Sequence, residues 1–357
     1  MNAAHATHAT DHTTARRSTR GSIRRSFGEF GLPAAAALTA TLLLFLVTPL
    51  DGAFGFVFIG ALLFLFGVFV AVYRTQGRMH AFDRLASAAV SLAALAAITP
   101  LVLMIGTVVA RGLAHVSFNL ISETLEGVDP SAPATQGGAL HAIVGTLTQV
   151  LYATAVCVPF GIATAIYLHE IRGRLSTVVR VLVDAMSGVP SIVAGLFIYA
   201  VWVLGPGGGF SGFAASLSLA ILMLPTVART TEEMLKLVDP SLREASLALG
   251  SSQWRTVLLV VLPTARTGIV TAVILGIARI AGETAPLLMT AFGNDRVVGP
   301  FGSLSEPQSA LPLFIFQQFA QDQRDRAWAA ALLLIALVLA LFILARVIAR
   351  PRKRRSS

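Results

Sequence analysis

Long apolar stretches are the feature that most restricts how this 357-residue chain can fold. A helix needs about 20 mostly apolar residues to cross the hydrocarbon core of a bilayer. Only helices and closed barrels satisfy the backbone polar groups there, and runs without alternating polarity indicate helices. The sequence therefore predicts an all-α integral membrane protein, a polytopic bundle of about eight transmembrane helices, at roughly 32–50, 53–73, 86–110, 139–168, 182–204, 211–228, 267–292 and 327–349.

The composition excludes a water-soluble globule. Hydrophobic residues make up 55% of the chain and charged residues 13%, whereas soluble proteins carry roughly 25% charged residues. Cys157 is the single cysteine, so neither an internal disulfide nor a cysteine-based metal site can form. The net charge of +9 is spread over loops without interleaved aromatic residues, so we expect contact with membrane lipids and not with nucleic acid.

The basic residues also predict the orientation, because Lys and Arg in short loops are retained on the cytoplasmic side. Threading the spans in order places most basic clusters on one side, so both termini are predicted to be cytoplasmic. Residues 1–31 are polar and basic and are expected to form a disordered tail, with a second basic tail at 351–357. Histidines of the first tail lack a fixed second shell, and no metal site is predicted.

The loop at 229–266 is the longest connection on the predicted cytoplasmic side, and it has the pattern of two short helices. Pro240 suits a helix start, and Ser241 with Glu244 has the spacing of a capping box. Gly250 can take the left-handed conformation that ends a helix. One helix face is apolar and combines Leu242, Ala245 and Leu249. This face could pack against the ends of membrane helices or receive a partner.

The same loop resembles a known motif. Glu244, Ala245, Ser246 and Gly250 are followed after nine residues by the sequence VVLP that ends at Pro263. This pattern is similar to the EAA motif of ABC importer permeases, with Ser and Val as substitutions. The resemblance implies a coupling helix that docks on a separate nucleotide-binding subunit. The chain has no G-x-x-x-x-G-K-[ST] loop, so it cannot bind ATP in that way itself.

Two charged residues fall within the predicted seventh span. Arg279 and Glu283 are four residues apart and are expected on one helix face. A charged side chain at the centre of a membrane helix costs about 2.5 to 3.5 kcal/mol on insertion scales, and such residues mark substrate or ion pathways. A structural ion pair is the alternative. A guanidinium matches phosphate oxygens, so the pair fits an anion such as phosphate.

Small residues and a proline interrupt the predicted fifth span. Ser187, Gly188, Pro190 and Ser191 are consistent either with close helix packing or with a helix broken toward the pathway. The sequence leaves these two interpretations open. Near the same end, Asp184 lies one turn from Arg180 and is expected to pair with it.

A wider resemblance covers residues from about Ala86 to Arg350. The segments HAIVGTL, SGVPSIVAGLFIYA, LPTVARTTEEML and GETAP resemble the PstA-type phosphate permease family. The resemblance implies a type I (MetI-like) importer core at 86–350, with two extra helices at 32–85 that have no assigned role. It implies import of inorganic phosphate across a bacterial inner membrane, and a substrate pathway that includes Thr284, Ser187 and Ser191.

The resemblance also implies partners. These are a PstC-type permease subunit, a PstB-type ATPase dimer that binds ATP and magnesium, and a PstS-type phosphate-binding protein, with no cofactor in this chain. Two alternatives remain: a permease for another oxyanion or small solute, and an ion-coupled carrier in which Arg279 and Glu283 act as a relay. No catalytic constellation in the sequence favours an enzyme.

Overall fold

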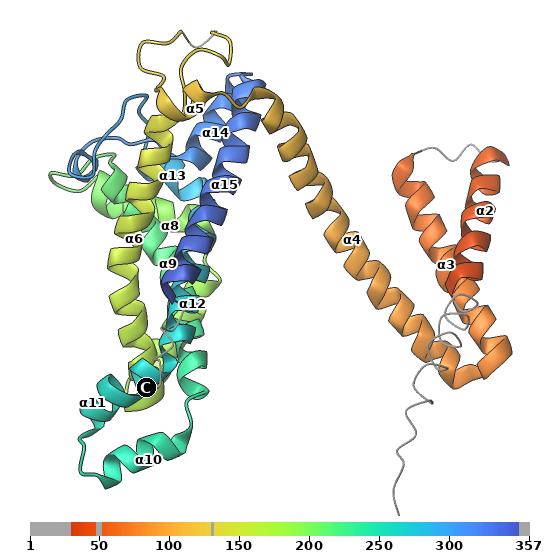
Figure 1. Cartoon of the computed structure of the whole chain (residues 1–357), viewed down its shortest axis with the longest axis horizontal. Helices are drawn as coiled ribbons and strands as arrows, with labels where there is room; N and C mark the ends of the chain where they lie inside the picture. The colour runs from red at the N-terminus through yellow and green to blue at the C-terminus, as the bar shows by residue number, and fades with distance from the viewer. Residues whose placement is uncertain (1–29, 48–51, 130–131, 350–357) are drawn as a thin grey trace, which may run out of the picture. The chain divides into compact units, whose positions relative to one another are not determined.

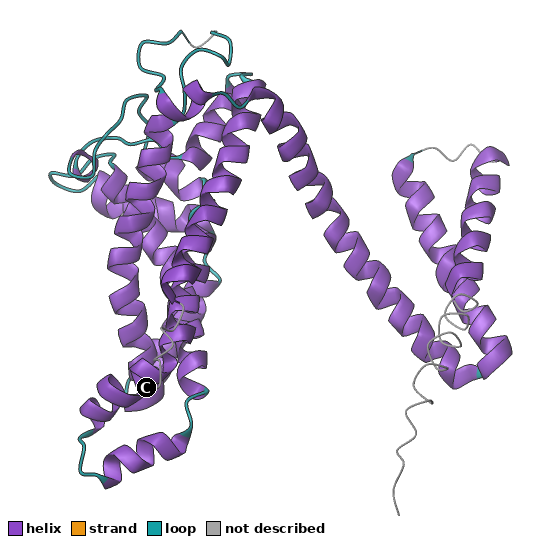
Figure 2. Cartoon of the chain, in the orientation of Figure 1, coloured by secondary structure: helices purple, strands orange, loops and turns teal. Residues whose placement is uncertain are grey.

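The computed structural model describes residues 30–47, 52–129 and 132–349. In this part of the chain the regular elements are helices joined by loops (Figure 2). Both predicted tails fall wholly or almost wholly outside it. The chain divides into two compact units, one up to Ile105 and one from Gly106 onward.

The first unit contains a helical hairpin. Its helices are α2 (Leu32–Val47) and α3 (Ala53–Gln76), followed by α4 (Arg78–His115), which runs past the unit boundary. Glycine allows the hairpin helices to approach closely, since a Cβ on Gly67 would lie 3.2 Å from the Cβ of Pro33. Small residues at such contacts are typical of membrane helices, which associate through close packing.

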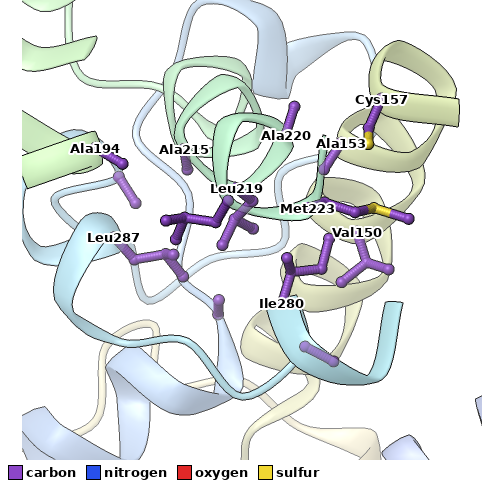
Figure 3. Close-up of a cluster of buried hydrophobic side chains, with 14 of the residues drawn as sticks. Val150, Ala153, Cys157, Ala194, Ala215, Leu219, Ala220, Met223, Ile280 and Leu287 are labelled. Atoms are coloured by element: carbon purple, nitrogen blue, oxygen red, sulfur yellow. The ribbon is translucent and has the colours of Figure 1, made fainter. Parts of the chain in front are cut away.

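The second unit is a helical bundle built around α9 (Gly212–Lys236), the most buried of its membrane-length helices. It packs against α6 (Leu140–Ile166) and α12 (Leu262–Ile280), and α15 (Arg324–Ala349) packs on α12. Figure 3 shows the core, where Leu219 and Met223 of α9 lie beside Ile280 and Leu287.

Shorter elements lie between these helices, some at the two ends of the bundle and others, such as α8 and α13, within it. The 229–266 loop lies at one end, and α5 and the loops beside it lie at the other (Figure 1). The connecting elements are α5 (Phe118–Ser122), η2 (Tyr167–Ile171), α7 (Ser176–Ser187), α8 (Ser191–Ile198), η3 (Tyr199–Val203), α10 (Pro240–Ala248), α11 (Gln253–Thr256), η4 (Val257–Val261), α13 (Ala285–Thr290), η5 (Gly302–Leu304) and α14 (Leu311–Ala320).

The membrane fold agrees with the prediction in class and differs in three spans, the first, the fifth and the seventh. Within the described residues, six helices are long and apolar enough to cross a bilayer, and the number is seven if one bent helix pair is counted as a single span. The helix at the predicted first span, α2, has only 16 described residues. The predicted fifth span is the bent pair, because α7 and α8 meet at 107° around Pro190.

The predicted seventh span is also interrupted. Its helix α12 ends at Ile280, and α13 begins at Ala285. Pro286 has no N–H to donate to the carbonyl of Gly282, and its ring would clash with that carbonyl in a continuous helix. The expectation that Arg279 and Glu283 share one helix face was therefore wrong, because Glu283 lies in the break.

Candidate functional site

The 229–266 loop contains the predicted helix, α10, but a different residue caps it. The side chain of Asp239 accepts a hydrogen bond from the backbone N–H of Ser241 at 2.9 Å, and Pro240 occupies the first turn. This bond holds the pKa of Asp239 below its usual range. The predicted capping box between Ser241 and Glu244 was wrong, because Pro at the first helical position makes the preceding Asp the N-cap.

The end of α10 is as predicted. Gly250 has φ +81°, a left-handed conformation that glycine adopts without steric cost. The N–H of Gly250 donates to the carbonyl of Leu247 at 2.9 Å, and that of Ser251 donates to the carbonyl of Ser246 at 3.2 Å. These two bonds form a Schellman motif, which stops the helix and turns the chain.

A continuous helical run leads from the turn into the membrane. It comprises α11, η4 and α12, and spans Gln253–Ile280. The π-helical segment ends at Val261, two residues before Pro263, whose missing N–H removes a helix hydrogen bond. Ser246 and Thr256 share a hydrogen bond of 2.9 Å, so α10 is tied to the start of this run.

Arg243 fixes α10 to the rest of the bundle. Its guanidinium lies 2.8 Å from a carboxylate oxygen of Glu170 in η2. It also donates to the backbone carbonyls of Leu235 at 2.8 Å and Val238 at 2.7 Å, near the end of α9. The glutamate side chain is 8% exposed and the arginine side chain 19%, so this ion pair is largely shielded from water. Nothing local in the sequence indicates this ion pair, because its partners are 73 residues apart.

The remaining predicted docking residues face outward. Leu242 is 42% exposed and Leu249 is 87% exposed. Ser241, Glu244, Ala245 and Pro263 are exposed as well. An apolar face is thus presented on a helix that is capped at both ends and tied to the bundle. The expectation that this helix is available to a partner is consistent with its exposure, and its docking role stays a prediction.

Ion pairs join α7 to α9 close to the loop. Arg180 lies 2.8 Å from a carboxylate oxygen of Glu232, and Arg229 pairs with Asp184. The expected pairing of Asp184 with Arg180 was therefore wrong. Each arginine therefore pairs with a carboxylate on the other helix. Such pairs link α7 to α9, whereas a pair within one helix would link no two elements.

Arg279 and Glu283 are not paired with each other in the described part of the chain. The guanidinium of Arg279 donates to the hydroxyl of Thr226 in α9 at 3.0 Å, and its side chain is exposed. Glu283 is half-buried and its carboxylate has no hydrogen-bond partner among the described residues. A cation without a carboxylate partner at membrane depth is suited to an anionic ligand.

The two helix breaks belong to neighbouring elements, since α8 packs on α13. A Cβ on Gly195 would lie 2.7 Å from the Cα of Pro286. Ser187 is exposed and donates to the carbonyl of Asp184 at 2.6 Å. Ser191 begins α8, and Thr284 precedes α13 without a side-chain capping bond. Backbone groups are therefore freed at two adjacent breaks, as in the broken helices of transporters.

Comparisons with known proteins identify relatives of the chain. The sequence profile of the family described as "Binding-protein-dependent transport system inner membrane component" matches residues 157–354. The "Phosphate transport system permease protein PstA" of Mycobacterium leprae (strain TN) is 43% identical over 249 residues, which cover 68% of this chain and 81% of that protein. The "Phosphate transport system permease protein PstA 1" of Mycobacterium tuberculosis is 41% identical over 268 residues, covering 72% and 85%.

A solved structure supports the fold. It is titled "Crystal structure of a bacterial ABC transporter involved in the import of the acidic polysaccharide alginate", and its matching chain has a TM-score of 0.53 at 14% identity, with 77% of this chain and 99% of that chain covered. The membrane-length helices, the broken spans and the exposed helical loop define a multi-pass membrane transport subunit. The chain belongs to the family of binding-protein-dependent transport system inner membrane components.

Proposed function

We propose that this chain is the permease subunit of an ATP-driven importer of inorganic phosphate and forms half of its translocation pathway. The similarity to phosphate permeases over about two thirds of the chain carries the substrate assignment. The geometry of Arg279 supports it, because a guanidinium held only by a hydroxyl keeps donors free for an oxyanion. Glu283, Thr284, Ser187 and Ser191 lie at the two helix breaks and complete the proposed pathway.

In this proposal the coupling work comes from a separate ATPase dimer, which binds ATP and magnesium. The exposed face of α10 receives that ATPase, and the end of the bundle that carries it is cytoplasmic, as are both termini. The partners are a homologous permease subunit, which supplies the other half of the pathway, and an extracytoplasmic phosphate-binding protein. These assignments correspond to PstC-type, PstB-type and PstS-type proteins.

Uptake of radiolabelled phosphate by vesicles that contain the whole complex tests the pathway assignment. Arg279→Ala should abolish uptake and leave assembly with the ATPase intact. Arg266→Ala is the matched control, because this exposed arginine lies on the same helix and has no side-chain partner among the described residues. Normal uptake by Arg279→Ala, or equal losses in both variants, would refute the role.

The alternative is a permease for another oxyanion. A guanidinium donates hydrogen bonds to phosphate and to sulfate alike. A carboxylate such as Glu283 can accept a hydrogen bond from protonated phosphate, but sulfate has no such proton at neutral pH. Excess sulfate should therefore not compete with phosphate uptake. If sulfate inhibits phosphate uptake equally in the unchanged protein and in Glu283→Gln, the permease has a broader oxyanion range and Glu283 does not discriminate.

A further inference from the structure

A cleft of about 590 Å³ lies between α10 and the ends of the membrane helices. Arg243 and Leu247 line it from α10, Lys236 from α9, and His169 and Arg172 from the end of η2 and its C-cap. A second cavity of about 350 Å³ shares His169, Arg172 and Lys236 with it. The proposed docking residues Leu242, Ala245 and Leu249 do not line either cavity, so the cleft is distinct from the docking face.

Among the described charged residues around the cleft, one cation has no carboxylate partner. Glu170 is neutralised by Arg243. Glu232 is reached by Arg180 at 2.8 Å and by Lys236 at 3.5 Å, and Glu233 is 2.7 Å from Lys236. No carboxylate among the described residues pairs with Arg172, whose Nε donates only to the carbonyl of His169 at 3.1 Å. The terminal nitrogens of its guanidinium are therefore available to a ligand.

The backbone at Arg172, the C-cap of η2, is left-handed. The residue has φ 50°, in the left-handed region, where a side chain costs about 1 kcal/mol. Glycine or asparagine is the usual residue at such a helix end.

We propose that this cleft binds a phosphate group between Arg172 and Lys236. The guanidinium of Arg172 supplies the charge that no carboxylate among the described residues compensates, and its fork matches phosphate oxygens. The ammonium of Lys236 contacts Glu232 and Glu233 and has a third N–H left to donate to the phosphate. Arg243 compensates the charge of Glu170. The source is either free inorganic phosphate or the headgroup of an anionic lipid. Because Arg243 and Leu247 of α10 form one wall of the cleft, a phosphate group bound there would contact α10 and regulate coupling. This regulatory consequence rests on the proposed function, whereas the binding itself does not.

The sequence supplies a chemical reporter for the cleft. Lys236 and Lys353 are the only two lysines, and Lys236 lines both cavities. In the purified complex, reconstituted in phosphatidylcholine nanodiscs, an amine reagent is applied with increasing inorganic phosphate. Labelling of Lys236 is measured by mass spectrometry relative to Lys353. It should fall about tenfold when phosphate is at ten times its dissociation constant, by mass action. Sodium chloride of matched ionic strength should give no protection.

A second arm distinguishes the two sources. Nanodiscs that contain phosphatidate should protect Lys236 without added phosphate if the ligand is a lipid headgroup, and only free phosphate should protect it otherwise. Arg172→Asn should abolish protection, since asparagine tolerates the left-handed backbone and lacks the charge. Arg174→Asn is the control, because it removes the same charge from an exposed residue that does not line the cleft.

Three results would overturn the proposal: protection in neither arm, equal protection by chloride, or protection that survives Arg172→Asn. Failure of the proposed function is a separate outcome. It would appear as absent phosphate uptake by a complex in which Lys236 is still protected.

Discussion

The guanidinium of Arg243 and the carboxylate of Glu170 form a shielded ion pair that ties the helix of the 229–266 loop to the end of a membrane helix run. A carboxylate oxygen and a guanidinium nitrogen lie 2.8 Å apart, and the arginine also donates to two backbone carbonyls. A displacement of α10 by a partner would therefore be passed to η2 and α9 through direct contacts, in addition to the continuous run that leads into α12.

Removal of this ion pair should weaken the coupling of ATP hydrolysis to phosphate uptake. Arg243→Met leaves Glu170 as a largely buried charge without its partner, which costs about 3 kcal/mol. We expect a lower melting temperature for the complex and ATP hydrolysis that no longer drives phosphate uptake. Arg255→Met is the control, since this exposed arginine of the same loop has no side-chain partner among the described residues. Equal effects of both changes would contradict the prediction.

A double-mutant cycle isolates the pair itself. Glu170→Gln alone should impair coupling less than Arg243→Met, because the arginine retains its two backbone carbonyls. In the double variant the two losses should be less than additive, as is usual for residues in direct contact. Additive losses in melting temperature and uptake would show that the two residues act independently.

The turn after α10 can be tested at Gly250. Alanine there would have to adopt φ +81°, at a cost of about 1 kcal/mol. This should raise hydrogen exchange of the α10 amides by about fivefold. Gly209→Ala is the matched control, since Gly209 also has open space around it but has no positive φ. Exchange that is unchanged in Gly250→Ala would show that the left-handed turn does not hold the helix.

Much of this architecture was predictable from sequence because its signals are local. A long apolar run is sufficient to predict a membrane helix, and Pro240 and Gly250 mark the limits of α10 by their own backbone restrictions. The break after Ile280 was hidden because apolar residues on both sides of it form one span-length run, although Pro286 was a signal for it. Glu170 and Arg243 could not be paired from sequence, because nothing local indicates which distant carboxylate an arginine will reach. The residue roles in the pathway and the domain limits stay predictions.

The hydroxyl of Thr226 should orient Arg279 for its ligand. Thr226→Val preserves the side-chain shape and removes the 3.0 Å hydrogen bond. Without this hydrogen bond, phosphate binding at Arg279 should be weaker by about 1 kcal/mol. The apparent KM for phosphate uptake should then rise about fivefold, with little change in assembly of the complex. Thr230→Val, one turn further along α9, is the control. An unchanged KM would indicate that Arg279 is positioned without the hydroxyl.

The close approach of α8 and α13 predicts a strong effect at Gly195. A Cβ there would lie 2.7 Å from the Cα of Pro286, which is backbone and cannot rotate away. Gly195→Ala should therefore shift one broken helix against the other, with a cost of about 1 to 3 kcal/mol, and should reduce uptake. Gly188→Ala is the control at the same break, because its nearest contact would be an ordinary 3.6 Å. Reduced uptake by the control alone would contradict the proposed packing role.

The Asp239 cap predicts a dependence of α10 on pH. Its pKa is lowered in the folded protein from a usual value of 3.8, because the carboxylate accepts the N–H of Ser241. A carboxyl with a lowered pKa stabilises the fold at pH values above its usual pKa, and this stabilisation is lost as the pH falls through the lowered value. Protection factors of the α10 amides should therefore be constant from neutral pH down to the usual pKa and decline below it. Asp239→Asn keeps an acceptor without a titrating charge, so its protection should not change over that interval. A decline of the same size in Asp239→Asn would assign the pH dependence to another group.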